Sequence, residues 1–108
     1  MSSESVAPEA VERDQRWREF NASAATIPWR ELERYYAAGL VRTLSEGQDL
    51  IEVACDLAED KAGPIQSLID QGELEAPTAE QAQSWHDENR SLWALVVAPW
   101  VLVQARGQ

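Results

Sequence analysis

The sequence predicts one small α+β domain, with about four helices and a small three-stranded sheet that ends in a hydrophobic C-terminal strand. The chain has 108 residues, of which 44% are hydrophobic, enough for one core and too few for two domains. Apolar residues at helical spacing alternate along it with short runs rich in Leu, Val and Thr. Its single cysteine, Cys55, excludes an intramolecular disulfide framework.

The two ends of the chain differ in composition from its middle. Residues 1–23 are rich in Ser, Glu and Ala and hold few large apolar side chains, which predicts a disordered polar tail. Residues 24–104 form the predicted domain, and residues 105–108 are a polar end. No apolar run approaches the roughly 18 residues that span a membrane, and the N-terminus lacks the pattern of a secretory signal. We therefore expect a cytoplasmic protein without a membrane partner.

The first predicted helix follows Thr26, which can cap it, and Pro28 is tolerated in its first turn. The apolar stripe of this helix consists of Trp29, Leu32 and Tyr36. Gly39 is expected to end it, because glycine adopts positive φ without strain. Residues 40–44 then predict a short strand.

Two further helices are expected in the middle of the chain. Asp49 caps the first, whose apolar residues recur at i, i+3, i+4 and i+7. Asp60 is expected to cap the second, over residues 61–71, and Gly72 to end it. Leu74 and its neighbours predict a short second strand.

The last predicted helix begins at Thr78, which forms a capping box with Gln81, and ends at Asn89. Residues 93–103 follow without a charge, and their Val content favours a strand over a helix. Because apolar and polar residues do not alternate there, both faces of the strand should be covered. Pro99 cannot donate to a strand ladder, which places it at a bulge or an open edge.

This order of elements is that of a winged helix, with residues 49–71 as its helix-turn-helix and an additional helix in place of the wing. A three-stranded α+β sandwich of other connectivity is the alternative. A recognition helix for DNA carries basic and amide side chains toward phosphates and bases. Residues 61–71 offer one base, Lys61, so we do not expect nucleic acid as a partner.

The net charge of −10 comes from the middle of the chain. Residues 43–89 hold twelve of the nineteen acidic residues and one of the nine basic residues. Such a segment is typical of solvated helix faces that keep a small protein soluble. The other interpretation is an acidic docking face for a basic partner or a cation. Its candidate residues are Glu52, Asp56 and Glu59.

Side chains suited to catalysis are few. His86 is the only histidine, and Asp87 and Glu88 beside it point in other directions around a helix, so no metal site is predicted. Cys55 lies among acids, which disfavour its thiolate. No nucleophile motif accompanies His86, and no glycine-rich phosphate loop is present. We expect no catalytic residue, no metal and no cofactor.

Four of the five tryptophans lie at apolar positions of the predicted elements, where they favour the core. Tryptophan also suits interfaces, because it combines a large contact area with a polar group. A last strand that is apolar on both faces needs more cover than one small domain supplies. Part of it is therefore expected in a homodimer or partner interface. The candidate interface residues are Trp93, Val97, Pro99, Trp100 and Val101.

Three stretches, IPWREL, DLIEVACDLAED and LWALVVAPWVLVQ, resemble a family of short bacterial proteins known as domain of unknown function 2288. The resemblance runs from Thr26 to Gln104, and PWVLVQ is its most specific part. It implies a stand-alone cytoplasmic bacterial protein and brings no activity and no site residues with it.

The sequence as a whole predicts a non-enzymatic protein–protein interaction module with acidic helices. The alternative is a small-molecule or divalent-cation binding protein, with or without weak hydrolase activity. Its candidate groups are the carboxylates around Glu52, Asp56 and Glu59.

Overall fold

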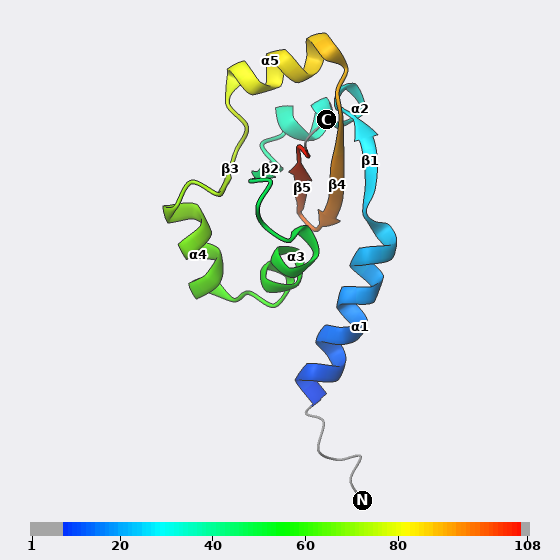
Figure 1. Ribbon diagram of the computed structural model, residues 1–108, viewed down its shortest axis with the longest axis vertical. Coiled ribbons are helices and arrows are strands. Elements are labelled where there is room, and N and C mark those ends of the chain that lie inside the picture. Colours follow the sequence, from blue (N-terminus) through cyan, green and yellow to red (C-terminus); the bar gives the residue numbers. More distant parts are fainter. Residues whose placement is uncertain (1–7, 107–108) are drawn as a thin grey trace, which may run out of the picture.

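Figure 1 shows the computed structural model, which describes residues 8–106, with side chains from residue 11 onward. The described part has five helices and five strands. The helices are α1 (Pro8–Ser23), α2 (Trp29–Ala37), α3 (Leu50–Ala58), α4 (Ala62–Asp70) and α5 (Ala79–Glu88). The strands are β1 (Ala25–Pro28), β2 (Val41–Leu44), β3 (Leu74–Glu75), β4 (Ser91–Val97) and β5 (Trp100–Gln104). The predicted mixture of helices and sheet is confirmed.

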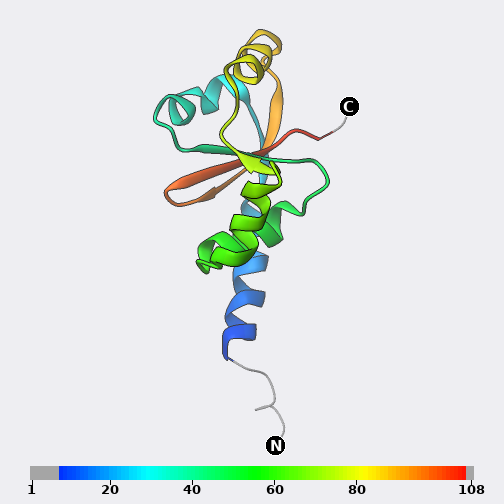
Figure 2. The same cartoon turned by 90° about the vertical axis from the view of Figure 1, so that its left-hand side faces the viewer.

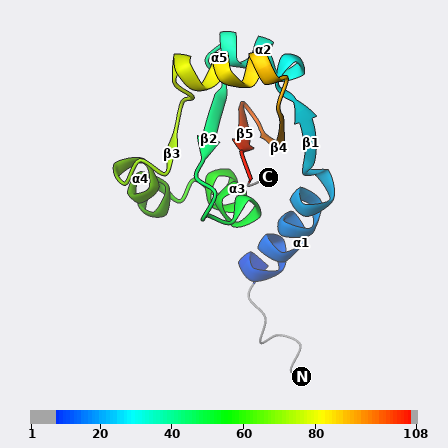
Figure 3. The ribbon, with the colours of Figure 1, turned by 45° about the horizontal axis from the view of Figure 1, so that its top comes forward.

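All five strands belong to one mixed sheet, in the order β1-β4-β5-β2-β3 (Figure 3). Strands β2 and β5 run parallel, and the other neighbouring strands run antiparallel. The C-terminal segment of the chain therefore supplies β4 and β5, which occupy interior positions between strands from earlier in the sequence.

The charge-free run of residues 93–103 is a hairpin rather than one strand. Ala98 and Pro99, joined by a cis peptide bond, form the turn between β4 and β5. The expectation that Pro99 lies at a bulge or an open edge is wrong, because a turn residue needs no ladder partner. The prediction that both faces of this segment are covered is confirmed for most of its length, since successive side chains of a strand point to opposite faces.

Helices pack on both faces of the sheet (Figure 2). Helices α1, α3 and α4 cover one face, here called the α3 face, and α2 and α5 cover the other, the α2 face. The core on the α3 face consists of Leu44, Leu50, Ile51, Val53, Ala54, Leu74, Leu95, Val97 and Leu102. The core on the α2 face consists of Trp29, Leu32, Val41, Trp85, Leu92, Ala94, Val101 and Val103.

Helix α1 lies where a disordered tail was expected. Residues 8–23 are helical, whereas residues 1–7 of that predicted tail lie outside the described residues. Trp17 and Phe20, three positions apart on one side of α1, pack against the core of the α3 face. Apolar burial against another element thus offsets the ordering entropy that the segment could not offset alone.

The winged-helix arrangement does not match the structure in detail. The described helices number five instead of four and the strands five instead of three. Helix α1, strand β1 and the division of the last strand into a hairpin account for the difference. Thr26, expected to cap the first helix, lies in β1 instead, and Pro28 is the N-cap residue of α2.

Most of the predicted helix ends are confirmed. The side chain of Asp49 accepts hydrogen bonds from two backbone N–H groups in the first turn of α3. Thr78 and Gln81 form the expected capping box. Asn89 and Gly72 follow α5 and α4 with positive φ of 44° and 72°, so the chain leaves each helix through a left-handed residue.

The predicted cap of the second middle helix is wrong. Asp60 has φ of 55° and lies in the turn after α3, and α4 begins at Ala62 with Lys61 as its N-cap residue. Lys61 makes no side-chain capping hydrogen bond. A left-handed residue cannot take the extended conformation that an N-cap needs, which is why the aspartate does not cap this helix.

One polar side chain lies inside the core. Gln104 in β5 is 1% exposed, and its Nε2 donates to the backbone oxygens of Ser45 (2.9 Å) and Gln48 (2.7 Å). Its Oε1 accepts from Nε of Arg106 (2.8 Å). The hydroxyl of Ser45 and the amide of Gln48 in turn donate to Glu73, and these bonds hold the pKa of Glu73 below its usual value. Gln104 therefore anchors the loop between β2 and α3 to the middle of the sheet.

Replacing Gln104 with Leu should lower the free energy of unfolding by roughly 2–3 kcal/mol, because the carbonyls of Ser45 and Gln48 lose their buried donor. Urea denaturation measures this loss. Gln83→Leu is the matched control, since Gln83 is exposed on α5 and bonds only to Asp87 one turn away; it should change stability by less than about 0.5 kcal/mol. Equal effects of the two substitutions would contradict the anchoring role.

Candidate functional site

The carboxylates of the predicted acidic docking face lie on the side of α3 that contacts α1. Arg13 Nη1 is 2.7 Å from Glu59 Oε1 and 3.1 Å from Asp56 Oδ1, and its Nη2 is 2.8 Å from Glu52 Oε1. Arg16 Nη1 is 2.7 Å from Glu59 Oε2. The basic partner of this acidic face is therefore helix α1 of the same chain.

These ion pairs change the titration of the groups that form them. Burial by itself raises the pKa of Glu59, but the hydrogen bonds and charge of Arg13, with hydrogen bonds from Arg16 and Lys61, outweigh it and hold the pKa below its usual value. The pKa of Arg13 is raised, and the largest cause is its side-chain hydrogen bond to Glu52. Glu59 thus stays ionised at neutral pH, with its charge offset by the arginines of α1.

The structure gives no support to a cation site in this cluster. Among residues 8–106, as far as their side chains are described, no three His, Cys, Asp or Glu residues come together in a way that could hold a metal ion. Cys55, on the same helix, is fully buried, and this burial raises the pKa of its thiol. Cys55 is therefore a packing residue.

His86 has a partner that sequence spacing did not predict. Its Nδ1 lies 2.8 Å from Oε2 of Glu33, so the pair joins α5 to α2 on the α2 face. Asp87 and Glu88 are exposed and lie elsewhere around α5. The side chains of these three consecutive residues therefore do not converge.

The five predicted interface residues do not lie on one surface. Val97 and Val101 are buried, on the α3 face and the α2 face respectively. Trp93 and Trp100 are partly buried, and Pro99 is exposed in the turn. Figure 2 shows the tip of this hairpin projecting from the body of the domain, between α2 above and α4 below. The tip therefore separates two different surfaces, one on each face of the sheet.

On the α2 face, the hairpin carries an uncovered apolar surface that we call the hairpin patch. Val96 is 64% exposed: it pairs with Val101 of β5, but the pairing of β4 with β1 ends at Ala94, so Val96 lies beyond the end of β1. A hollow of about 430 Å³ adjoins it. Helix α2 has nine residues and spans about 13 Å, whereas the seven residues of β4 span about 23 Å, so α2 is too short to cover the strand. The hairpin patch consists of the exposed Val96, the partly buried Ile27 and Tyr35 and the buried Val101, together with Phe20 of α1, which also packs against the core of the α3 face.

On the α3 face, a second apolar hollow of about 430 Å³ lies between α4 and the sheet; we call it the α4 groove. Ile69 on its wall is 48% exposed. Arg42 is the basic residue of its lining, and the guanidinium lies 4.6 Å from the centre of the Trp100 ring. The apolar residues of the α4 groove are Leu57, Ile65, Ile69, Leu74, Ala76, Trp100 and Leu102.

Arg42, Ile69 and Val96 are candidate binding residues that the sequence did not predict. A signal for Arg42 was available, since a lone charge inside the predicted strand LVRTL is unusual for a buried strand. No sequence signal distinguishes Val96 from the buried valines around it. Its exposure depends on where α2 ends in space.

Comparison with known proteins places the chain among relatives. A family model described as a protein of unknown function, DUF2288, matches residues 16–105. The chain belongs to the DUF2288 family. The resemblance seen in IPWREL, DLIEVACDLAED and PWVLVQ is thereby confirmed. No curated protein matches the chain.

One solved structure is similar to this chain over most of its length. The NMR solution structure of PA1075 from Pseudomonas aeruginosa is similar, with a TM-score of 0.74 and 28% sequence identity. The match covers 95% of this chain and 93% of PA1075. Within the part that the structure describes, no helix of this DUF2288 protein has the length and apolar character that crossing a membrane requires.

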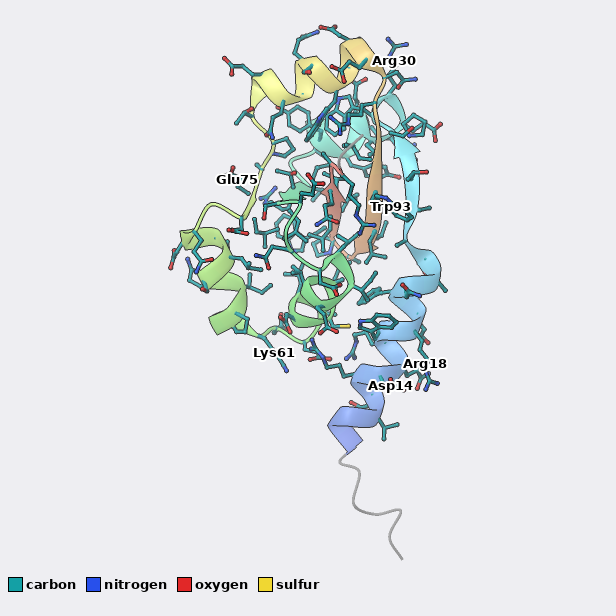
Figure 4. The ribbon with its side chains drawn as sticks, in the orientation of Figure 1. Asp14, Arg18, Arg30, Lys61, Glu75 and Trp93 are labelled. Atoms are coloured by element: carbon teal, nitrogen blue, oxygen red, sulfur yellow. The ribbon has the colours of Figure 1, made fainter. Side chains whose placement is uncertain are left out.

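Arg13→Gln should lower the free energy of unfolding by roughly 1–2 kcal/mol, because partly buried carboxylates lose a charged donor. For a domain of this size the melting temperature should then fall by about 5–10 °C. Arg18→Gln is the control: Arg18 is on the same helix, pairs with Asp14 one turn away, and points away from α3 (Figure 4). Comparable losses in the two variants would argue against docking through the cluster.

The pH dependence of stability should report on Glu59. Its pKa is lower in the folded state than in the unfolded chain, so its contribution is complete above about pH 5 and is lost as the pH falls through the folded value. Thermal unfolding between about pH 3 and pH 7 should show a smaller acid destabilisation in Arg13→Gln than in the wild type. Parallel curves for the two proteins would contradict the coupling.

Proposed function

We propose that this DUF2288 protein is a non-enzymatic protein–protein interaction module that binds its partner through the hairpin patch. The observation that carries the proposal is the exposure of Val96, 64%, on the part of β4 that extends beyond β1. An apolar surface left open on a small domain marks an interaction site.

The surroundings of Val96 support this function. Tyr35 brings an aromatic ring with a polar hydroxyl to the rim, which is typical of protein interfaces. Ile27 and Phe20 extend the apolar area along β1 and the end of α1. Pro99, one of the expected interface residues, is exposed at the projecting hairpin tip beside the patch, where a partner can reach it.

The proposed partner is another protein or a second copy of this chain. The net charge of −10 favours a partner with a basic rim around its apolar contact and disfavours nucleic acid. We place the interaction in the cytoplasm. Divalent cations are left out of the proposal, because Glu52, Asp56 and Glu59 are already paired with arginines of α1.

Val96→Glu should weaken partner binding with little loss of stability, because the side chain is already exposed in the free protein. Light scattering after size exclusion measures self-association, and affinity capture from extracts of the source cells measures other partners. The matched control is Val11→Glu, an equally apolar residue that is 52% exposed on α1, away from the hairpin.

We expect that the wild type and Val11→Glu both form a complex, either with a second copy of the chain or with one other polypeptide. In Val96→Glu its affinity should fall at least about tenfold. The proposal would be overturned if the wild type is monomeric at high concentration and captures the same polypeptides as Val96→Glu does.

A further inference from the structure

We propose that the α4 groove is a separate binding site for a small monocarboxylic acid with an apolar body, whose carboxylate binds Arg42. The inference goes beyond the proposed protein–protein function, because it concerns the opposite face of the sheet. It depends on the geometry of one cation at the mouth of an apolar hollow.

The groove has the shape and lining of a small-molecule site. Its volume of about 430 Å³ lies within the range of ligand pockets, roughly 300–1,000 Å³. Leu102 and Leu74 lie on the sheet below it, and Ile65 and Ile69 of α4 form its wall. An aliphatic or aromatic body would gain the free energy of removing apolar surface from water there.

Arg42 is oriented by its surroundings and has donors to spare. Its Nη1 donates to the backbone oxygens of Val41 (2.8 Å) and Gly39 (3.2 Å), and its guanidinium lies over the ring of Trp100. Among the described residues, no carboxylate pairs with Arg42, in contrast to Arg13 on α1, and its Nε and Nη2 have no protein acceptor. A guanidinium held in this way can present two N–H groups to one carboxylate.

The charge of the site selects a monoanion. Arg42 and Glu75 are the two charged residues of the lining, and the guanidinium of Arg42 offsets one negative charge. Glu75 lies at the outer edge of β3 (Figure 4). It is opposite Thr43 in the sheet register, so its side chain and that of Arg42 point to opposite faces. A dianion such as a phosphate monoester would carry an uncompensated charge into a domain whose net charge is already −10.

The test uses octanoate and 1-octanol as probes, because they share an apolar chain and differ in the charge of the head group. Titration of the full chain is followed by NMR, through the methyl groups of Ile65 and Ile69 and the indole N–H of Trp100. Octanoate should shift these signals with a Kd below about 1 mM, and 1-octanol should bind at least about tenfold more weakly.

Arg42→Gln should weaken octanoate binding about tenfold or more and leave 1-octanol binding unchanged, because only the charged head group loses its partner. The matched control is Arg34→Gln. Arg34 also lies over an aromatic ring, that of Tyr35, at 4.8 Å, but outside the groove. It should bind octanoate as the wild type does.

A second variant keeps the test decisive if Arg42→Gln does not fold. Ile69→Glu places a negative charge on an already exposed part of the wall and should likewise weaken octanoate binding, whereas Val96→Glu should not. Any of three results would overturn the proposal: equal binding of octanoate and 1-octanol to the wild type, signals that shift elsewhere on the protein, or unchanged octanoate binding by these groove variants.

Val96→Glu tests the hairpin patch, and Arg42→Gln tests the groove. The failure of one function is therefore distinguishable from the failure of the other.

Discussion

The β4–β5 hairpin must bury apolar side chains on both of its faces, and the rest of the structure is arranged around this requirement. Leu95 and Leu102 point to one face, and Ala94 and Val103 to the other. A sheet with two apolar faces needs a layer of helices on each. Helices α3, α4 and α1 provide one layer and α2 and α5 the other, so the last part of the chain organises the elements that precede it.

Helix α1 combines the two kinds of stabilisation that hold this layer in place. Trp17 and Phe20 supply apolar contact with the core, and Arg13 and Arg16 supply charged donors to α3. Exposed ion pairs contribute little, but this cluster is partly buried and shares Glu59 between both arginines. The acidity that marks the middle of the sequence is therefore locally offset in the folded protein.

The same layers leave two areas open because their helices are short. Nine-residue helices do not reach the projecting end of the hairpin, so Val96 is uncovered on one face and the α4 groove is open on the other. The two surfaces differ in chemistry. The hairpin patch is apolar with an aromatic rim, as protein interfaces are, whereas the groove adds a single guanidinium, as sites for small anions do. One hairpin tip thus borders two candidate binding surfaces.

The sequence by itself determined the family and most of the helix ends, although not the caps expected at Thr26 and Asp60. Helical spacing, the caps at Asp49 and Thr78 and the left-handed ends at Gly72 and Asn89 depend on residues a few positions apart, and the structure agrees with each of them. Only the tertiary structure decided that residues 93–103 fold back as a hairpin, that α1 docks on the acidic side of α3, and that Arg42 meets Trp100. Each of these depends on contacts between residues far apart in the chain. The lengths and positions of the packed elements, rather than local propensity, determine which side chains remain exposed.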